Sequence, residues 1–140
     1  MKVEERELSA TCARLTGAGL ALRLTAASGC MVPTIRPGDL VLIHPVGARP
    51  LAAGDVVAFR RGEQVVVHRL VGVATSGEWQ TRGDAEAGEG VPVKGEDVVG
   101  RVEGLERGGK RLPLTPWLAA RAYGTLRRWA GRVSRRVGLR

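Results

Sequence analysis

Glycine and proline interrupt this chain so often that its apolar residues fall into short runs. Twenty of its 140 residues are glycine and seven are proline, and valine is frequent whereas aromatic residues are scarce. Short valine-rich runs between turn-forming residues are typical of strands joined by tight turns, not of a helical bundle. The length suits one domain with a modest core. The sequence therefore predicts a small, mainly β domain.

Strands are expected at six places in this domain. They are residues 20–25, 40–43, 55–60, 64–72, 79–82 and 97–105. The segment 61–63 (Arg-Gly-Glu) predicts a hairpin turn, and 83–90 predicts an acidic loop. A short helix is expected at 3–16, because acids lie in its first turn and glycines follow it. We divide the chain into a helical segment (1–19), a β domain (20–112) and a tail (113–140).

Positive charge is concentrated in the tail. The net charge is +8, of which residues 116–140 contribute +7 and residues 1–115 only +1. Apolar residues recur there at helical spacing, which predicts a basic amphipathic helix. Three roles stay open for it: binding an anionic membrane surface, packing on the body or a partner, and binding nucleic acid, which we expect least.

The two cysteines, Cys12 and Cys30, show neither metal-site spacing nor a disulfide framework. Reduced thiols in a reducing compartment are the simpler interpretation. No stretch approaches the roughly 20 apolar residues of a spanning helix, and residues 1–6 lack the apolar run of a signal peptide. We therefore expect a cytoplasmic protein, peripheral on the inner face of the membrane if its tail binds lipid, without metal or organic cofactor.

The segment most informative about function is 28–39, Ser-Gly-Cys-Met-Val-Pro-Thr-Ile-Arg-Pro-Gly-Asp. It places a small nucleophile, Cys30, in a turn, and His68 comes from a separate apolar run. A neighbouring base activates a nucleophile by accepting its proton. The pattern therefore predicts a Cys30–His68 dyad, provided that the fold brings the two side chains together.

Segment 28–39 resembles the nucleophile box of the signal peptidase I family and of its SOS-repressor-type autopeptidase relatives, which have serine where this chain has Cys30. Three later segments resemble the other boxes of that family in the same order: 54–59 (Gly-Asp-Val-Val-Ala-Phe), 67–72 (Val-His-Arg-Leu-Val-Gly) and 81–84 (Thr-Arg-Gly-Asp). The similarity covers about residues 20–107. It implies the β-fold of those domains and an endopeptidase that cleaves a leader or precursor peptide.

The resemblance also implies catalytic roles. Cys30 would attack the scissile carbonyl, and His68 would be the base, as in the archaeal and endoplasmic-reticulum members. Asp84 would support His68. The Ser28 hydroxyl and the Cys30 backbone N–H would form the oxyanion hole.

The resemblance also implies roles for further residues, on the basis of less specific motifs. Met31 and Pro33 would shape the substrate side of the site. A second acid is expected at Glu86 or Glu89, in a loop that is about one residue shorter than in the family. The peptide substrate would lie extended along a strand edge near Met31.

Cys30 is the departure from the family pattern. A thiol ionises more readily than a hydroxyl, but a larger atom can misplace the oxyanion geometry. Three interpretations stay open: a working thiol peptidase, an inactive domain of the same fold that binds peptides or partners, and a serine-to-cysteine change made in the laboratory. A self-cleaving regulator is less expected, because nothing in the sequence resembles a helix-turn-helix.

Overall fold

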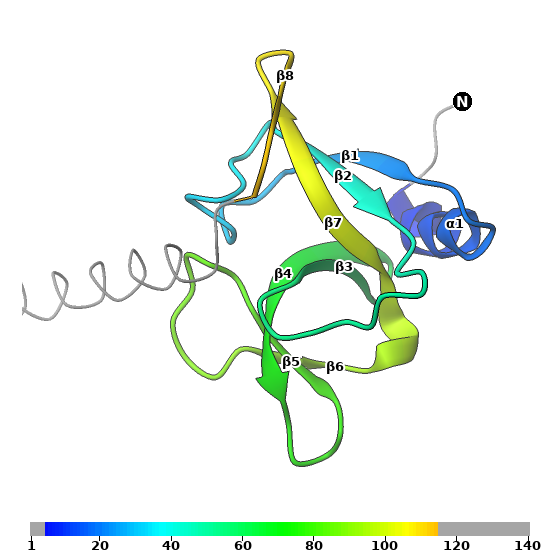
Figure 1. Cartoon of the computed structure of the whole chain (residues 1–140), viewed down its shortest axis with the longest axis vertical. Helices are drawn as coiled ribbons and strands as arrows, with labels where there is room; N and C mark the ends of the chain where they lie inside the picture. The colour runs from blue at the N-terminus through cyan, green and yellow to red at the C-terminus, as the bar shows by residue number, and fades with distance from the viewer. Residues whose placement is uncertain (1–4, 115–140) are drawn as a thin grey trace, which may run out of the picture.

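One antiparallel sheet forms the framework of the described part of the chain (Figure 1). The computed structural model describes residues 5–114, with side chains from residue 8 onward. Seven strands are hydrogen-bonded in the order β1-β2-β7-β3-β4-β5-β6, and β8 pairs with β7. The strands are β1 (Leu22–Thr25), β2 (Leu40–His44), β3 (Val56–Arg61), β4 (Gln64–Val73), β5 (Trp79–Arg82), β6 (Val91–Val93), β7 (Val98–Arg107) and β8 (Lys110–Leu112).

The predicted class, mainly β with one short N-terminal helix, is confirmed. Helix α1 (Glu5–Gly17) occupies the expected place, and a 3-10 turn, η1 (Gly95–Asp97), precedes β7. All six expected strands are present with small shifts at their ends. The short strands β6 and β8 were not expected. The predicted basic helix of the tail lies outside the described residues.

The hairpin between β3 and β4 is one residue tighter than expected. Arg61 pairs with Gln64, so only Gly62 and Glu63 form the turn. Gly62 has φ +61°, and two-residue hairpin turns of this kind need positive φ values that glycine adopts without strain.

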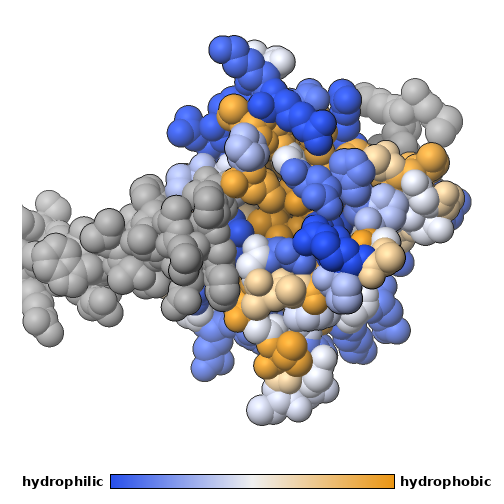
Figure 2. Space-filling view, in the orientation of Figure 1, coloured by the Kyte–Doolittle hydropathy of each residue, from blue (hydrophilic) through white to orange (hydrophobic). Residues whose placement is uncertain are grey.

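The core lies on both faces of the sheet. Along β3, Val56 and Ala58 belong to one buried cluster, whereas Val57 and Phe59 belong to the other. Successive side chains of a strand point to opposite faces, so this alternation marks β3 as a central strand. Figure 2 shows apolar side chains gathered along the middle of one face of the molecule, with hydrophilic side chains around them.

Helix α1 packs against β4, β7 and β1. Its Cys12 is 3% exposed and joins the larger core cluster. Burial raises the pKa of the Cys12 thiol, so this sulfur stays protonated at neutral pH. The buried Ser9 hydroxyl donates to the Gly62 carbonyl (3.1 Å) and ties the helix to the β3–β4 turn.

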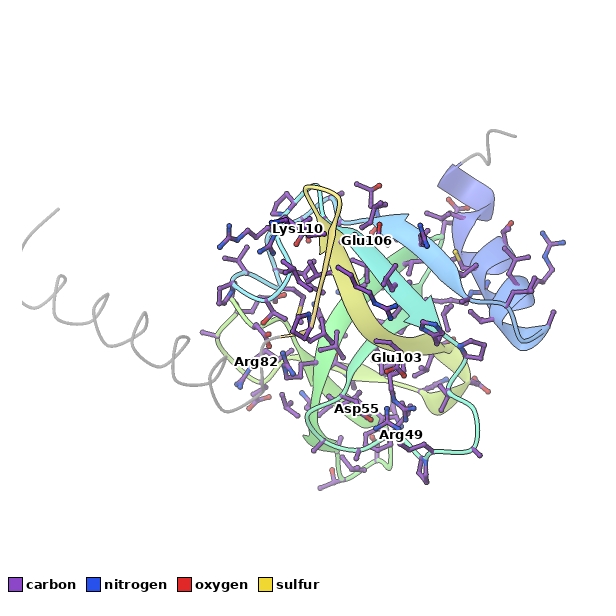
Figure 3. The ribbon with its side chains drawn as sticks, turned by 45° about the horizontal axis from the view of Figure 1, so that its top comes forward. Arg49, Asp55, Arg82, Glu103, Glu106 and Lys110 are labelled. Carbon is purple, nitrogen blue, oxygen red and sulfur yellow. The ribbon has the colours of Figure 1, made fainter. Side chains whose placement is uncertain are left out.

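Arginines hold the long β2–β3 connection against the sheet. The buried Arg101 of β7 donates to three backbone carbonyls, those of Val46, Arg49 and Pro50. Arg49 lies 4.0 Å from Asp55 and 3.7 Å from Glu103, and the three side chains gather on one side of the sheet (Figure 3). The connection is therefore anchored although it contains no strand.

Candidate active site

The predicted nucleophile lies in the loop of residues 26–39, which joins β1 to β2 and is closed at its base by hydrogen bonds. The Ala26 N–H donates to the Asp39 carbonyl (2.8 Å). The buried Asp39 carboxylate accepts from the Arg36 N–H (2.8 Å) and from the Arg107 guanidinium (2.7 and 2.9 Å). The Arg107 guanidinium holds the pKa of Asp39 below its usual range, although burial opposes this. The Val32–Pro33 peptide bond in the loop is cis.

Three reactive side chains from distant parts of the chain converge beside this loop. They are Cys30 of the loop, His68 of β4 and Glu86 of the connection between β5 and β6. One nitrogen, oxygen or sulfur atom from each lies within 4.8 Å of the others. The thiol and the imidazole that the sequence pairs therefore lie close together.

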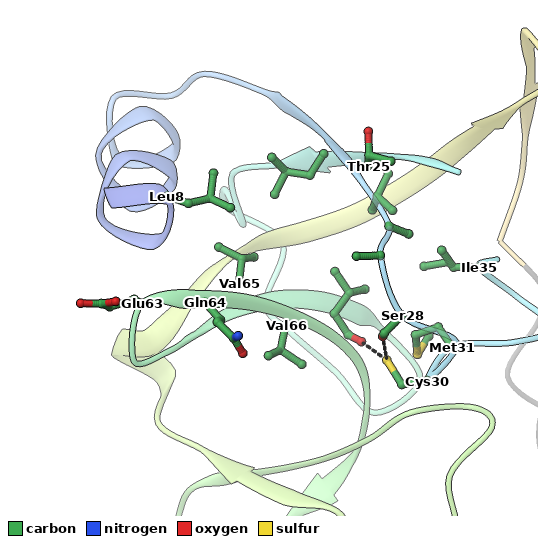
Figure 4. Close-up of a pocket in the computed structure, with 15 residues that line it drawn as sticks. Leu8, Thr25, Ser28, Cys30, Met31, Ile35, Glu63, Gln64, Val65 and Val66 are labelled. Atoms are coloured by element: carbon green, nitrogen blue, oxygen red, sulfur yellow. Dashed lines mark hydrogen bonds between the residues drawn. The ribbon is translucent and has the colours of Figure 1, made fainter. Parts of the chain in front are cut away.

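Two hydrogen bonds position the Cys30 sulfur. The exposed Ser28 hydroxyl donates to Sγ at 3.2 Å. The Cys30 thiol in turn donates to the Val67 carbonyl, with 3.7 Å between sulfur and oxygen (Figure 4). The predicted oxyanion residue Ser28 thus contacts the nucleophile itself.

The hydrogen bonds of His68 decide which ring nitrogen is basic. Its imidazole is buried, and Nδ1 lies 3.1 Å from the Thr81 hydroxyl oxygen. That hydroxyl donates to the Val91 carbonyl (2.9 Å). Because Thr81 has a single hydroxyl hydrogen, it must accept from Nδ1–H, so the free lone pair of a neutral imidazole is on Nε2. The ring also meets the Phe59 ring edge-on, at 5.5 Å between centroids.

Glu86 is the carboxylate that contacts the imidazole. Its Oε1 lies 3.1 Å from His68 Nε2, and its side chain is 43% exposed. Burial lowers the pKa of His68, and the Glu86 carboxylate opposes that effect without cancelling it. A largely neutral imidazole at neutral pH can accept a proton, and the nearby carboxylate stabilises the imidazolium that results.

Asp84 does not make the contact predicted for it. Its carboxylate accepts from Arg69 Nε (2.9 Å) and Nη2 (2.8 Å) and from the Thr34 hydroxyl. The Arg69 and Asp84 side chains are 3% and 5% exposed. Both nitrogens of His68 have other partners, Thr81 and Glu86. Asp84 therefore joins β4 to the loop of residues 26–39, and it does not orient the His68 imidazole by contact.

Gly83 allows the loop that carries Glu86 to dock on the nucleophile. The Ala85 N–H donates to the Cys30 carbonyl (2.9 Å). A Cβ atom at position 83 would collide with that same carbonyl. The absence of a side chain at Gly83 is thus a steric requirement of the site.

A largely apolar groove of about 690 Å³ runs from Cys30 towards α1 (Figure 4). Leu8 of α1 and Cys30 lie at its opposite ends. One wall is β1, an edge strand, and the other is residues 64–67 of β4. This part of β4 pairs with β3 alone, because β5 pairs with β4 only from Arg69 onward. Two free strand edges therefore flank the groove, a geometry suited to an added strand.

Of the remaining residues predicted for the site, some line this groove and others do not. Met31 lines the groove and is 2% exposed, whereas Pro33 is not among the lining residues. Of the two candidate acids, Glu86 reaches the imidazole, while the Glu89 carbonyl accepts from the Gln80 side chain. Of the two, Glu86 is therefore the acid that contacts the imidazole.

Sequence reasoning missed the residues that hold the site together. Thr81 and Arg69 have no individual signal in the sequence, because a buried threonine or arginine is recognised only through its partners. Their positions within two motif segments, 81–84 and 67–72, are the nearest indication.

No model of a known protein family matches this chain, and no curated protein shows significant similarity to it. Among residues 5–114, no helix is long and apolar enough to cross a membrane. The chemistry of the site is therefore inferred from its own atoms.

Proposed function

We propose that this chain is a thiol endopeptidase of the signal-peptidase-like class that cleaves an extended segment of a leader or precursor peptide. The observation that carries the proposal is the convergence of the Cys30 sulfur, the His68 imidazole and the Glu86 carboxylate within 4.8 Å. Cys30, the member of this cluster that lines the groove, lies at one end of it, between two free strand edges. A nucleophile, a base and an acid at the end of a peptide-sized groove form the constellation that acyl transfer requires.

The reaction begins with transfer of the Cys30 proton to His68 Nε2. The thiolate attacks the scissile carbonyl carbon, and the Ser28 hydroxyl and the Cys30 N–H donate to the oxyanion. The imidazolium then protonates the departing amine as the C–N bond breaks, which leaves a thioester. His68 next takes a proton from water, the hydroxide cleaves the thioester, and the thiol is restored.

The two acids have different parts in this scheme. Glu86 contacts Nε2 and stabilises the imidazolium, and its exposed side chain can turn outward when Nε2 faces the thiol. Asp84 is a positioning residue, because it acts through Arg69 and Thr34 on the loops that carry the reacting groups.

The groove indicates the kind of substrate. Its lining is largely aliphatic, which favours small and medium apolar side chains near the scissile bond: Leu8, Leu24, Ala26, Met31, Ile35, Val41, Val65 and Val67. Backbone hydrogen bonds to β1 and β4 would hold any extended peptide, and these pockets would select among sequences.

A second candidate is a peptide-binding domain of the same fold without catalysis. One observation favours it. His68 Nε2, the nitrogen that a base must offer to the nucleophile, faces Glu86 at 3.1 Å. If the Glu86 carboxylate stays against His68 Nε2, the groove would bind peptides without cleaving them.

A thiol-reactivity experiment separates the two candidates. The full chain is treated with a limiting thiol-directed probe, and labelling of Cys30 and Cys12 is followed by mass spectrometry. The proposal predicts fast labelling of Cys30 that His68→Gln abolishes and the matched control His44→Gln leaves intact. Equal, slow labelling of both cysteines would overturn it.

Cleavage is then measured on a mixture of synthetic peptides with varied apolar residues. A working peptidase gives discrete products that depend on Cys30 and His68. The Cys30→Ser variant distinguishes a site whose native nucleophile is cysteine from a serine site that was changed to cysteine. Serine raises the cleavage rate only if the native nucleophile is serine. Peptide binding without products in every variant would establish the binding domain instead.

A further inference from the structure

We propose that Cys30, His68 and Glu86 form a binding site for a thiophilic divalent cation, with Zn²⁺ as the best fit, and that bound metal masks the Cys30 thiol. The inference goes beyond the proposed function, because it requires only that three ligand atoms converge. It holds whether or not the chain cleaves peptides.

The spacing of the ligand atoms suits a tetrahedral ion. One ligand atom from each side chain lies within 4.8 Å of the other two, and His68 Nε2 and Glu86 Oε1 are 3.1 Å apart. Zn²⁺ bonds of ~2.0–2.3 Å place tetrahedral ligands ~3.3–3.8 Å from one another. His68 Nε2 and Glu86 Oε1 already lie within that spacing, so an approach of the Cys30 thiol to these two atoms would close the site.

The ligand types favour Zn²⁺ over harder cations. A thiolate and an imidazole select Zn²⁺, whereas Mg²⁺ and Ca²⁺ require oxygen ligands. Three protein ligands leave a fourth position for water or a substrate group. On binding, the Cys30 thiol loses its proton to solvent and the sulfur lone pair bonds to the metal.

The surroundings of His68 resemble those of an imidazole prepared to bind a metal. Metal-binding histidines usually donate their second ring N–H to a neighbouring oxygen, which fixes the ring and its tautomer. Here Nδ1 is held by Thr81, whose hydroxyl donates to the Val91 carbonyl. Nε2 is thereby directed towards the two other ligands.

The consequence is control over the thiol. A metal ion bonded to Cys30 occupies the electron pair that would attack a carbonyl or react with an oxidant. Removal of the metal by a chelator would restore a free thiol. The cluster would thus couple the reactivity of Cys30 to the supply of zinc.

The test uses the full-length chain, stripped of metal and kept reduced. Zn²⁺ is titrated against a chromogenic chelator, and Co²⁺ is used as a spectroscopic probe. We expect one ion per chain, a thiolate-to-Co²⁺ charge-transfer band, and protection of Cys30 from alkylation. The Cys30→Ser and His68→Gln variants should each bind Zn²⁺ at least about 100-fold more weakly, because even residues behind the ligands change metal affinity by about 10- to 100-fold.

Matched controls make the result specific. The chain contains two cysteines and two histidines in all. The Cys12→Ala and His44→Gln variants should therefore keep the wild-type affinity and spectrum. Thr81→Val should weaken Zn²⁺ binding by about 10- to 100-fold if Thr81 orients the His68 ring. Circular dichroism establishes that each variant is folded.

Several outcomes would overturn the inference. They are wild-type affinity in folded Cys30→Ser, a Co²⁺ spectrum without sulfur ligation, or Cys30 alkylation that Zn²⁺ does not slow. Failure of the peptidase proposal looks different, because it appears as an absence of peptide products while metal binding and thiol protection persist.

Discussion

Asp84 and Glu86 are two carboxylates separated by one residue in the same loop, but their surroundings differ completely. The Asp84 side chain is 5% exposed and lies in a two-point ion pair with Arg69. The Glu86 side chain is 43% exposed and makes one contact, with an imidazole. An acid fixed on both oxygens holds loops together, whereas an acid with one contact and access to water can move and exchange partners. The partner, rather than the position in the motif, determines the role.

The largest expected difference between the two acids is in stability. Asp84→Asn removes the charge that pairs with the buried Arg69, and breaking a buried ion pair by removing one of its charges costs about 3–5 kcal/mol. Glu86→Gln, the matched control, should change stability by no more than about 0.5 kcal/mol. Urea denaturation followed by circular dichroism measures both. Similar losses in the two variants would contradict the comparison.

The second largest expected effect is on the contact between the loop that carries Asp84 and Glu86 and the loop that carries Cys30. Gly83→Ala puts a methyl group against the Cys30 carbonyl, and such overpacking costs about 1–3 kcal/mol. It should also abolish the preferential labelling of Cys30, because the two loops separate. Gly72→Ala is the control, since nothing lies within 4 Å of a Cβ there. Unchanged labelling in Gly83→Ala would show that the loops need not touch.

Asp39, a second buried carboxylate held by an arginine, tests whether fixed acids behave alike. Because Arg107 lowers the folded-state pKa of Asp39, its contribution to stability is complete above the ordinary carboxyl pKa of about 3.9. The contribution disappears as the pH falls through the folded-state pKa. The loss should be smaller than for Asp84, because the Arg107 side chain is 31% exposed.

The measurement is the melting temperature of wild type and Asp39→Asn across the acid range. The variant should melt several degrees lower at pH 7, and the difference should shrink on acidification. A difference that does not depend on pH would argue that the Asp39 charge does not stabilise the loop.

The smallest effect on stability belongs to Glu86, and its expected effect is on chemistry. Glu86→Gln removes the charge beside the His68 imidazolium, so alkylation of Cys30 should slow several-fold. The alkylation rate of Glu86→Gln is compared with that of the wild type. Glu89→Gln is the control, because the Glu89 carboxylate is not the partner of the imidazole. Faster alkylation in Glu86→Gln would mean that Glu86 blocks the dyad and would favour the binding domain.

Much of the fold could be predicted from the sequence, because short apolar runs between glycines determine strands locally. The helix and all six expected strands were found close to their predicted limits. The strands β6 and β8 were missed since each has only three residues. Such strands form because the sheet offers them a partner, and no local pattern encodes that.

The site could be predicted less completely. Cys30 and His68 were paired from motif order, and the structure places them together. The contact predicted between Asp84 and His68 is not found, because Asp84 pairs instead with Arg69, the residue that follows His68 in the chain. The basic nitrogen of His68 could not be predicted either, because it depends on the Thr81–Val91 hydrogen bond.

The brevity of β1 has a consequence for how any ligand is held. A strand of four residues is about 13 Å long, so an incoming chain can form only a few rungs of a ladder with it. With so few rungs, a chain that pairs with β1 alone should have a short residence time.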